Sequence, residues 1–178
     1  MLLPGQQQTR TFRFEMSKDQ LDEFDLSKYI QTPEKDQTEL LSPDDVLHKL
    51  VPVVIKSTSA GLRNCYLTEK SCSYLAAVLT SQFSHLKHLY LGDNDLRDSG
   101  VELLCSGLKH PNCKLETLQL DRCKLTEKSC SYLESALISD SCLEYLSLKF
   151  NGLKDTDVEQ LSKLEADHFY KLERLEWR

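Results

Sequence analysis

Cysteine and histidine come close together in the sequence at Cys105, His110 and Cys113, and both residue types are zinc ligands. Structural zinc sites usually pair their ligands at short spacings such as Cys-x-x-Cys, and they complete the coordination with a fourth ligand. The three residues here have neither feature. We therefore interpret them as parts of an ordinary loop and expect no metal site.

The chain has no recognisable arrangement of catalytic residues either. The histidines are scattered, and no serine or cysteine nucleophile comes with an evident base and an orienting carboxylate. Paired acids, Asp44 with Asp45 and Asp155 with Asp157, are better explained by the favourable interaction of negative charge with a helix start. The phosphate-binding motif Gly-x-x-x-x-Gly-Lys-Ser/Thr does not occur. We expect a protein that is not an enzyme and needs no cofactor.

The elements that carry these residues are repeated. The string LTEKSCSYL occurs twice without a change, at Leu67–Leu75 and at Leu125–Leu133. A finer pattern, Leu-x-x-Leu-x-Leu-x-x-Asn/Cys-x-Leu, starts at Leu86, Leu115 and Leu143, at intervals of 29 and 28 residues (115 − 86 and 143 − 115). This is the leucine-rich repeat pattern, whose units are roughly 20 to 29 residues long.

Each unit is predicted to form a strand, a turn and a helix. Alternate residues of an extended segment face opposite sides, so Leu118 and Leu120 face one side and Gln119 faces the other. Farther along the same unit, apolar residues recur at helical spacing: Cys130, Leu133, Ala136 and Leu137. Such a helix returns the chain to a parallel neighbouring strand. We expect an α/β leucine-rich repeat solenoid, a horseshoe segment with concave parallel strands and convex helices.

The turns after the strands alternate between two types, and we name the units after them. Asn94 and Asn151 mark the Asn-type units, in which the side-chain amide can satisfy backbone groups of the turn. Cys65 and Cys123 hold the same position in the Cys-type units. The structural module is therefore predicted to be a pair of units.

Helix starts are marked by side chains that can accept hydrogen bonds from free backbone amides. Thr68 and Thr126 take this place in the Cys-type units, and Asp98 and Asp155 take it in the Asn-type units. We expect each of these side chains to cap its own helix.

The chain divides into three segments. Residues 1–20 are polar and have no period, and we expect them to be disordered. Residues 21–56 are predicted to form a helical lead-in that caps the repeats. Residues 57–178 are predicted to contain about four repeat units and a terminal strand.

The lead-in has two predicted elements. Apolar residues from Leu21 to Ile30 indicate a short helix or turn. A second helix is expected to start at Ser42, because serine, proline and two acids in a row are a strong start signal. Pro52 is expected to end or kink this helix.

Charge and cysteine content restrict the function. The chain has 178 residues and a net charge of −6, which argues against binding to nucleic acid or an anionic membrane, because both need a basic surface. No apolar run approaches the roughly 20 residues of a membrane span, and the first residues do not resemble a signal peptide. Seven cysteines without an export signal indicate reduced thiols and a cytoplasmic protein.

The candidate binding site is the concave face. Strand residues that face away from the core would gather there, and tyrosine, phenylalanine and arginine among them are typical of protein-binding hot spots. The candidates are Arg63, His88, Tyr90, Asp93, Gln119, Asp121, Arg122, Tyr145, Lys149, Phe150, Arg174 and Glu176. A solvated face with incidental aromatic residues is the alternative interpretation. The last strand, from Leu172, also leaves an edge with which further repeats or another chain could pair.

The alternating units resemble the ribonuclease-inhibitor type of leucine-rich repeat. More narrowly, the strings Asn64–Cys72, Asp93–Val101 and Cys113–Leu118, with the lead-in at Phe24–Tyr29, are similar to the repeat region of NOD-like receptors, especially the type expanded in fish. The resemblance implies protein partners, among them a nucleotide-binding NACHT module in the parent receptor. The present chain lacks the phosphate-binding motif of such a module.

The resemblance implies a non-catalytic protein-interaction domain, the sensing or autoinhibitory region of an innate-immune receptor. Two alternatives stay open. One is an inhibitor module that occludes a basic enzyme with an acidic cup, as in ribonuclease inhibitor, and whose binding would depend steeply on salt. The other is a structural or autoinhibitory repeat segment without an external ligand.

Overall fold

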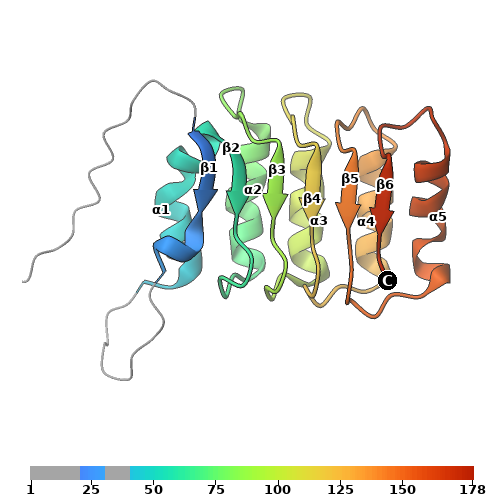
Figure 1. Cartoon of the computed structure of the whole chain (residues 1–178), viewed down its shortest axis with the longest axis horizontal. Helices are drawn as coiled ribbons and strands as arrows, with labels where there is room; N and C mark the ends of the chain where they lie inside the picture. Colours follow the sequence, from blue (N-terminus) through green and yellow to red (C-terminus); the bar gives the residue numbers. More distant parts are fainter. Residues whose placement is uncertain (1–20, 31–40) are drawn as a thin grey trace, which may run out of the picture.

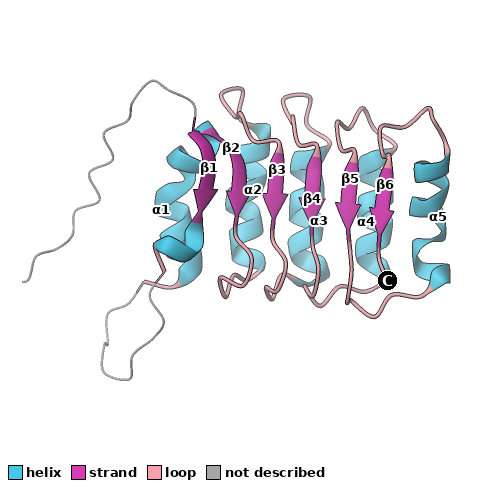
Figure 2. Cartoon of the chain, in the orientation of Figure 1, coloured by secondary structure: helices cyan, strands magenta, loops and turns pink. Residues whose placement is uncertain are grey.

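The computed structural model describes residues 21–30 and 41–178, which form two layers. One layer is a parallel sheet whose strands lie side by side in chain order (Figure 1). The other is a row of helices that covers one face of that sheet, as the colours of Figure 2 show. The predicted α/β leucine-rich repeat solenoid is therefore confirmed.

The strands and helices alternate along the chain. The strands are β1 (Leu21–Asp25), β2 (Ser57–Gly61), β3 (His88–Tyr90), β4 (Thr117–Gln119), β5 (Tyr145–Ser147) and β6 (Arg174–Glu176). The helices are α1 (Pro43–Lys56), α2 (Glu69–Thr80), α3 (Arg97–Leu108), α4 (Glu127–Leu137) and α5 (Asp155–Ala166), with the short 3-10 helix η1 (Leu26–Lys28) after β1. None of these helices is long and apolar enough to cross a membrane.

The core lies between the two layers and is built from the repeat leucines. The pairing of the inner strands places Leu89 beside Leu118 and Leu118 beside Leu146. All three side chains are buried, whereas Gln119 is half exposed. The predicted alternation of faces is thus confirmed. Burial of each such side chain contributes about 1.5 to 3 kcal/mol, and the stack of units adds these contributions along the array.

The N-terminal segment differs from the prediction. Leu21–Asp25, expected as a short helix or turn, form strand β1, and only the following three residues form a helical turn. The reason is packing: β1 pairs in parallel with β2, which sets Phe24 opposite Ala60 and buries both side chains. Residues 1–20, expected to be disordered, lie outside the part of the chain that the structure describes.

Helix α1 also runs past the residue expected to end or kink it. Pro52 lies inside the helix, which continues to Lys56. Leu50 before the proline and Val53 and Val54 after it are buried. This continuous apolar stripe holds both halves of the helix against the sheet, and it offsets the hydrogen bond that proline removes.

Asparagine side chains fill the turns as predicted, and they connect neighbouring units. The Oδ1 of Asn94 accepts hydrogen bonds from the backbone N–H groups of Cys65, at 3.1 Å, and Leu67, at 3.0 Å. Its Nδ2 donates to the carbonyl oxygens of Leu62, at 2.8 Å, and Leu91, at 2.7 Å. One buried amide therefore satisfies the backbone of two successive turns.

The other turn residues follow the same plan. Asn151 accepts from the backbone N–H of Cys123 at 2.8 Å and of Leu125 at 3.2 Å. In the Cys-type units the thiol of Cys123 donates to the carbonyl oxygen of Leu91 at 3.3 Å. Successive turns therefore alternate between asparagine, whose amide is a strong hydrogen-bonding group, and cysteine, whose thiol is a weak one.

Of the four predicted helix caps, two are observed and two are not. Thr68 and Thr126 do accept from the backbone of their own helices, as expected. Asp98 does not cap α3: its carboxylate accepts from the backbone N–H of Thr126 at 2.9 Å, from the Thr126 hydroxyl at 2.7 Å and from the Ser129 hydroxyl at 2.5 Å. Asp155 pairs with Arg178 instead of capping α5.

The same contact occurs one module earlier. The carboxylate of Asp44, at the start of α1, accepts from the backbone N–H of Thr68 at 3.1 Å, from the Thr68 hydroxyl at 2.8 Å and from the Ser71 hydroxyl. We call this arrangement the acid clasp: an aspartate in the first turn of one helix bonds threonine and serine at the start of the next helix, which belongs to a Cys-type unit. The acid stabilises the positive end of the neighbouring helix instead of its own.

Glycine at position 107 lets two helices approach closely. A Cβ added at Gly107 in α3 would lie 3.0 Å from the Leu79 Cβ and 3.1 Å from the Ala76 Cα in α2. Alanine normally favours a helix over glycine by about 1 kcal/mol. Here the overpacking cost of about 1 to 3 kcal/mol is expected to outweigh that gain.

We therefore predict that Gly107→Ala lowers the midpoint of urea unfolding. Ser106→Ala is the matched control, because Ser106 is an exposed neighbour in the same helix. It is expected to leave the midpoint unchanged or to raise it slightly. A higher midpoint for Gly107→Ala would show that the helices are not in the close contact described above.

Candidate protein-binding surface

The face of the sheet opposite the helices is free of covering elements among the described residues (Figure 1). Packed helices lie about 8 to 10 Å apart and paired strands about 4.8 Å apart, so a row of such units bends with its strands on the inner side. We call this inner surface the sheet face. It corresponds to the predicted concave face.

The structure places the twelve predicted residues in two adjacent rows instead of one. Six lie in strands: His88, Tyr90, Gln119, Tyr145, Arg174 and Glu176. The other six follow the strands, in the turns: Arg63, Asp93, Asp121, Arg122, Lys149 and Phe150. We call the turn row the turn ridge. The inner strands are only three residues long. The six residues of the turn ridge were predicted to lie in strands, and that prediction was wrong. None of the twelve is buried.

Charges along the turn ridge follow a repeated arrangement in which two cations share one acid. The carboxylate of Asp93 lies 2.8 Å from the Nε of Arg63 and 3.6 Å from a guanidinium nitrogen of Arg122. Arg63 and Arg122 belong to the units on either side of Asp93. The ridge is thus linked across three units.

A second trio lies next to the first and was missed by the sequence analysis. Asp95 accepts from the Nε of Arg97 at 2.9 Å and from the Nζ of Lys124 at 2.8 Å. These two cations hold the pKa of Asp95 at about 2. A signal was available, since Asp95 and Lys124 directly follow the marker residues Asn94 and Cys123 in the same turns.

The third trio lies at the C-terminal end of the sheet face. Glu176 pairs with Lys149 and Arg174 and accepts a hydrogen bond from the Tyr145 hydroxyl at 3.0 Å. The ion pair with Lys149, together with the bonds from Tyr145 and Arg174, lowers the pKa of Glu176 to about 2. Both Asp95 and Glu176 therefore stay ionised throughout the usual range of pH.

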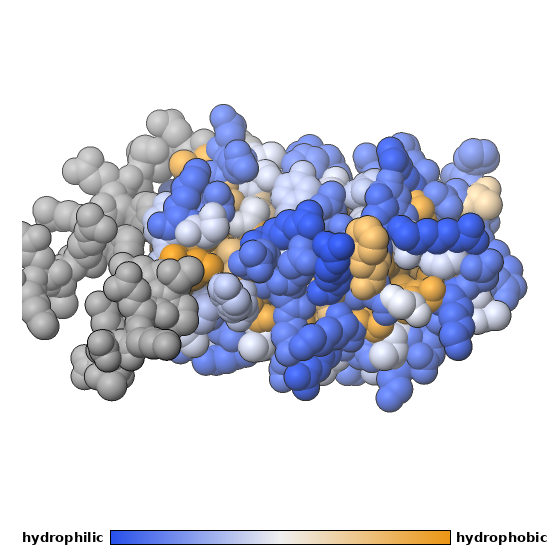
Figure 3. Space-filling view, turned by 60° about the horizontal axis from the view of Figure 1, so that its bottom comes forward, coloured by the Kyte–Doolittle hydropathy of each residue, from blue (hydrophilic) through white to orange (hydrophobic). Residues whose placement is uncertain are grey.

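In these trios the cations point outward. The side chain of Arg122 is 52% exposed and that of Asp93 25%, and the side chain of Arg174 is 69% exposed and that of Glu176 15%. Asp121 is also turned inward, where it accepts from the backbone N–H of Lys149 at 3.0 Å. The edge of the sheet face is hydrophilic in Figure 3, with hydrophobic side chains as separate spots. The exposed groups of the trios are therefore cationic, although the chain as a whole is acidic.

Phe150 is the most exposed hydrophobic side chain on this ridge. It is 61% exposed, and the guanidinium carbon of Arg122 lies 4.3 Å from the centre of its ring. Its backbone has a φ of 60°, in the left-handed region. This conformation costs a residue with a side chain about 1 to 2 kcal/mol. Asn64, Asp93 and Arg122 hold the equivalent positions of the other turns and have the same positive φ, so this conformation belongs to the turn of the repeat. What distinguishes position 150 is an exposed aromatic ring beside an arginine.

We predict that Phe150→Gly does not destabilise the fold. Glycine adopts the left-handed conformation freely, so relief of strain offsets the lost contact with Arg122, and the net change is expected to lie between zero and a gain of about 1 kcal/mol. Phe150→Ala is the control, because it removes the ring and keeps the strain. Urea unfolding of both variants tests the prediction. A less stable Phe150→Gly than Phe150→Ala would show that the strain is not there to relieve.

Burial shields most of the cysteine thiols. All seven are free, and six are buried. Burial raises the pKa of the thiols of Cys105 and Cys130 to about 12, so they stay protonated and weakly nucleophilic at neutral pH. Within residues 21–30 and 41–178 no three His, Cys, Asp or Glu side chains come together as a metal site. Cys113 packs in the core, and His110 accepts from the backbone N–H of Asn112 at 3.2 Å.

Comparison with known proteins gives the same type of repeat. A family model described as Leucine Rich repeat matches residues 84–105 and 139–162. The chain is 48% identical over 98 residues to the human NACHT, LRR and PYD domains-containing protein 3, a match that covers 55% of the chain and 9% of that protein. It is 43% identical over 122 residues to the mouse NACHT, LRR and PYD domains-containing protein 12, with 68% and 12% covered.

Ribonuclease inhibitor is similar to a comparable extent. The protein from Sus scrofa is 39% identical over 130 residues, which cover 73% of the chain and 28% of the inhibitor. The matches therefore span about a tenth of the receptor-type relatives and less than a third of the inhibitor.

Proposed function

We propose that this leucine-rich repeat array, similar to the repeats of the NACHT, LRR and PYD domains-containing proteins, is a non-catalytic protein-interaction region that works in the cytoplasm. By this proposal it serves as the sensing or autoinhibitory part of an innate-immune receptor, and it binds protein through the sheet face and the turn ridge. The observation that carries the proposal is the pair formed by the exposed ring of Phe150 and the guanidinium of Arg122.

Aromatic and arginine side chains are the groups that dominate protein interfaces. Hot spots are enriched in tryptophan, tyrosine and arginine, and they cluster near the centre of an interface. The proposed surface has a second such pair, in which the guanidinium of Arg174 lies 5.7 Å from the ring centre of Tyr145. The two pairs come from neighbouring units, so a single partner can contact both.

The charge of the ridge specifies the partner in this proposal. The exposed groups of the three trios are arginine and lysine, and their acids lie beneath them. Complementary charge steers association and selects partners. We therefore propose a partner with acidic side chains around an apolar anchor that fits beside Phe150. Nucleic acid is a poor candidate, because the chain is acidic overall and continuous basic surface supplies most of the affinity for nucleic acid.

The inhibitor alternative requires a different surface. A module that occludes a basic enzyme needs an acidic cup, whereas the outward groups of this ridge are mainly cations. The alternative in which the repeats dock only onto a NACHT module needs no external ligand. It differs from the sensing proposal in the identity of the bound protein, which the following experiment identifies.

Site-specific photo-crosslinking in cells tests the proposal. A photoreactive phenylalanine analogue replaces Phe150 in one variant, Tyr145 in a second and Ser131, which is exposed on helix α4, in a third. We expect the first two variants to yield the same protein adduct and the third to lack it. Adducts that are the same from all three positions, or absent from the first two, would contradict binding by the sheet face.

Two further variants assign the contact to side chains on the sheet face. The double substitution Tyr90→Ala with Tyr145→Ala is expected to abolish the adduct at position 150, while Ser131→Ala leaves it intact. When the crosslinking is repeated in lysate, higher salt is expected to lower the yield of the adduct, because salt screens the electrostatic contact that brings the two proteins together. Recovery of a basic enzyme as the crosslinked protein would support the inhibitor alternative instead, and recovery of a NACHT module would support the docking alternative.

A further inference from the structure

Of the asparagines in the chain, only Asn151 is followed by glycine. The side-chain amide of an asparagine can be attacked by the backbone nitrogen of the next residue. Glycine hinders this attack least, because it has no Cβ. The other asparagines precede cysteine, at Asn64 and Asn112, or aspartate, at Asn94. Asn151 therefore has the most reactive following neighbour.

The surroundings of this pair are open to water. Gly152 is exposed, its φ is 74°, and a Cβ added there would meet no atom within 4 Å. Asn151 itself is half buried, whereas Asn94, which has the same role in its own turn, is 4% exposed. Water can therefore reach the amide of Asn151 more easily than that of Asn94.

The folded turn holds the amide of Asn151 in place. The side chain makes hydrogen bonds to backbone groups of Cys123, Leu125, Leu120, Leu148 and Lys149. The Cγ atom can approach the nitrogen of Gly152 only after the side chain rotates, and this rotation breaks the hydrogen bonds. Local opening of the turn therefore controls any reaction between the two groups.

We propose that Asn151 is a deamidation site, that opening of the turn admits the reaction, and that the product loosens the turn. In the first step the nitrogen of Gly152 forms a bond to the Cγ of Asn151. The bond from Cγ to Nδ2 breaks, and ammonia leaves with the proton of the Gly152 nitrogen. Water then adds to a carbonyl carbon of the cyclic imide and opens the ring, which gives aspartate or isoaspartate.

Either product changes the bonding of the turn. A carboxylate can still accept from the N–H groups of Cys123 and Leu125, but it cannot donate. The carbonyl oxygens that the amide bonded then face an acceptor, and a buried acceptor without a donor lowers stability. Isoaspartate also routes the main chain through the side-chain carbon, which lengthens the backbone within the turn. The link between β5 and α5 is loosened in both cases.

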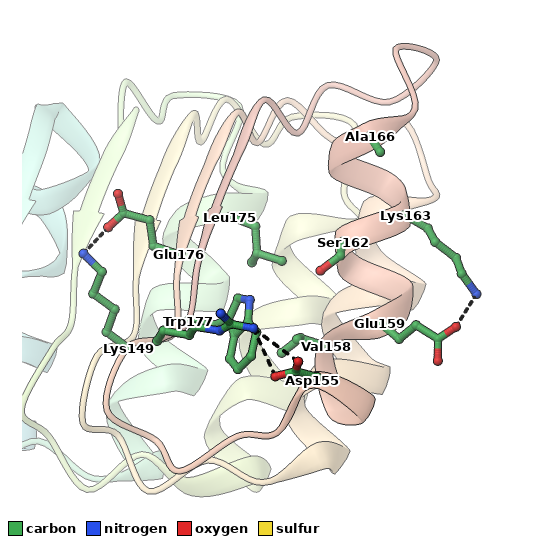
Figure 4. A pocket seen from close by; sticks show the side chains of 11 residues that line it. Lys149, Asp155, Val158, Glu159, Ser162, Lys163, Ala166, Leu175, Glu176 and Trp177 are labelled. Carbon is green, nitrogen blue, oxygen red and sulfur yellow. Dashed lines mark hydrogen bonds and ion pairs between the residues drawn. The ribbon is translucent and has the colours of Figure 1, made fainter.

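The neighbours of this turn belong to the proposed binding surface. Phe150 directly precedes Asn151, and the backbone carbonyl of Lys149 accepts a hydrogen bond from the Asn151 Nδ2. The side chain of Lys149 in turn reaches Glu176 of the third trio (Figure 4). A loosened turn therefore displaces both the exposed ring and a member of the trio. This effect on binding rests on the proposed function, whereas the reaction and the loss of stability do not.

Peptide mapping by mass spectrometry tests the site on the whole chain at mildly alkaline pH. We expect aspartate and isoaspartate to accumulate at Asn151, and Asn64, Asn94 and Asn112 to react much more slowly. In concentrated urea, where the turn is open, the rate at Asn151 is expected to rise about ten-fold or more. A rate that urea does not change, or an Asn151 that stays intact in the folded chain, would overturn the proposal.

Gly152→Lys is the matched variant for the role of glycine. Lys124 stands at the equivalent position of the preceding turn, with a φ of 59°, so the turn accommodates this residue. Its side chain hinders the attacking nitrogen, and we expect the reaction at Asn151 to slow several-fold in urea as well as in the folded chain. The same rate in urea with lysine as with glycine would contradict attack by the nitrogen of residue 152.

Asn151→Asp reproduces one product in uniform form. Its urea midpoint is expected to lie below that of the unmodified chain. The deamidated chain, separated by ion exchange, is expected to lose at least as much, because part of it contains isoaspartate. Unchanged midpoints for both would overturn the proposal.

Photo-crosslinking separates this proposal from the proposed function. With the photoreactive analogue at position 150, Asn151→Asp is expected to lower the adduct yield. Equal yields with and without Asn151→Asp would contradict the effect of deamidation on the binding surface. If the chain with Asn151 intact gives no adduct at position 150, the proposed function fails, while the peptide-mapping and midpoint results still decide the deamidation site.

Discussion

Leu118→Asp is expected to unfold the repeat array. Leu118 is 1% exposed and lies in β4, between Leu89 of β3 and Leu146 of β5. A carboxylate at this position has no cationic partner, and an unpaired buried charge is among the few changes that cost more than about 4 kcal/mol. The free energy of unfolding of a native domain is about 5 to 15 kcal/mol in total. Circular dichroism is expected to show loss of the cooperative urea transition.

The neighbouring residue provides a matched control. Gln119 is half exposed on the sheet face, so Gln119→Asp is expected to change the urea midpoint little. Leu118→Ala is a milder variant that should remain folded, with a loss of about 2 to 5 kcal/mol. Similar losses for Leu118→Asp and Gln119→Asp would contradict the alternation of faces on which the fold description depends.

Asn94→Ala is expected to have the second largest effect. The residue is 4% exposed, and its amide bonds the backbone N–H groups of Cys65 and Leu67 and the carbonyl oxygens of Leu62 and Leu91. Alanine leaves the N–H groups of Cys65 and Leu67 and the carbonyl oxygen of Leu62 buried without the amide, and it leaves the carbonyl oxygen of Leu91 with only the weak hydrogen bond from the Cys123 thiol. Each unsatisfied buried group costs about 1 to 3 kcal/mol, so we expect a loss of about 3 to 5 kcal/mol in urea unfolding.

Asn151→Ala tests whether burial decides the size of this effect. Asn151 makes the same set of bonds, to Cys123, Leu125, Leu120 and Leu148. It is half buried, so water can replace part of the lost amide. We expect a clearly smaller loss than for Asn94→Ala. A larger loss for Asn151→Ala would show that exposure is not the controlling variable.

Much of the fold could be predicted because its signals are local. The repeat period, the alternation around Leu118 and the helical stripe of Cys130 and Leu133 are patterns within a few residues of each other, and they respond to the geometry of strand and helix. The turn asparagines were predicted on the same basis. The strand at Leu21–Asp25 was missed, although Leu21, Phe24 and Leu26 have the repeat spacing, because the interval to the next unit is longer than the others.

The candidate surface was predicted less well. The strand residues Tyr90 and Tyr145 follow directly from alternation. Arg122 and Phe150 were predicted as candidates but assigned to strands, and the structure places them in turns. The trio of Asp95, Arg97 and Lys124 was missed. Asp95 and Lys124 are 29 residues apart in the sequence (124 − 95), so their contact can be recognised only when successive turns are aligned and not from either turn alone.

The amino-acid sequence alone determined the length of the unit, the two unit types, the order of strands and helices from residue 57 onward and the residues of the repeat core. These follow from periodicities of two and of about 3.6 residues, which depend only on backbone geometry. The tertiary structure decided which groups meet: Asp98 with the next helix instead of its own, and two cations on each of the acids Asp93, Asp95 and Glu176. Those contacts depend on how units that are about 29 residues long are stacked, and a shift of one residue in register would exchange every partner.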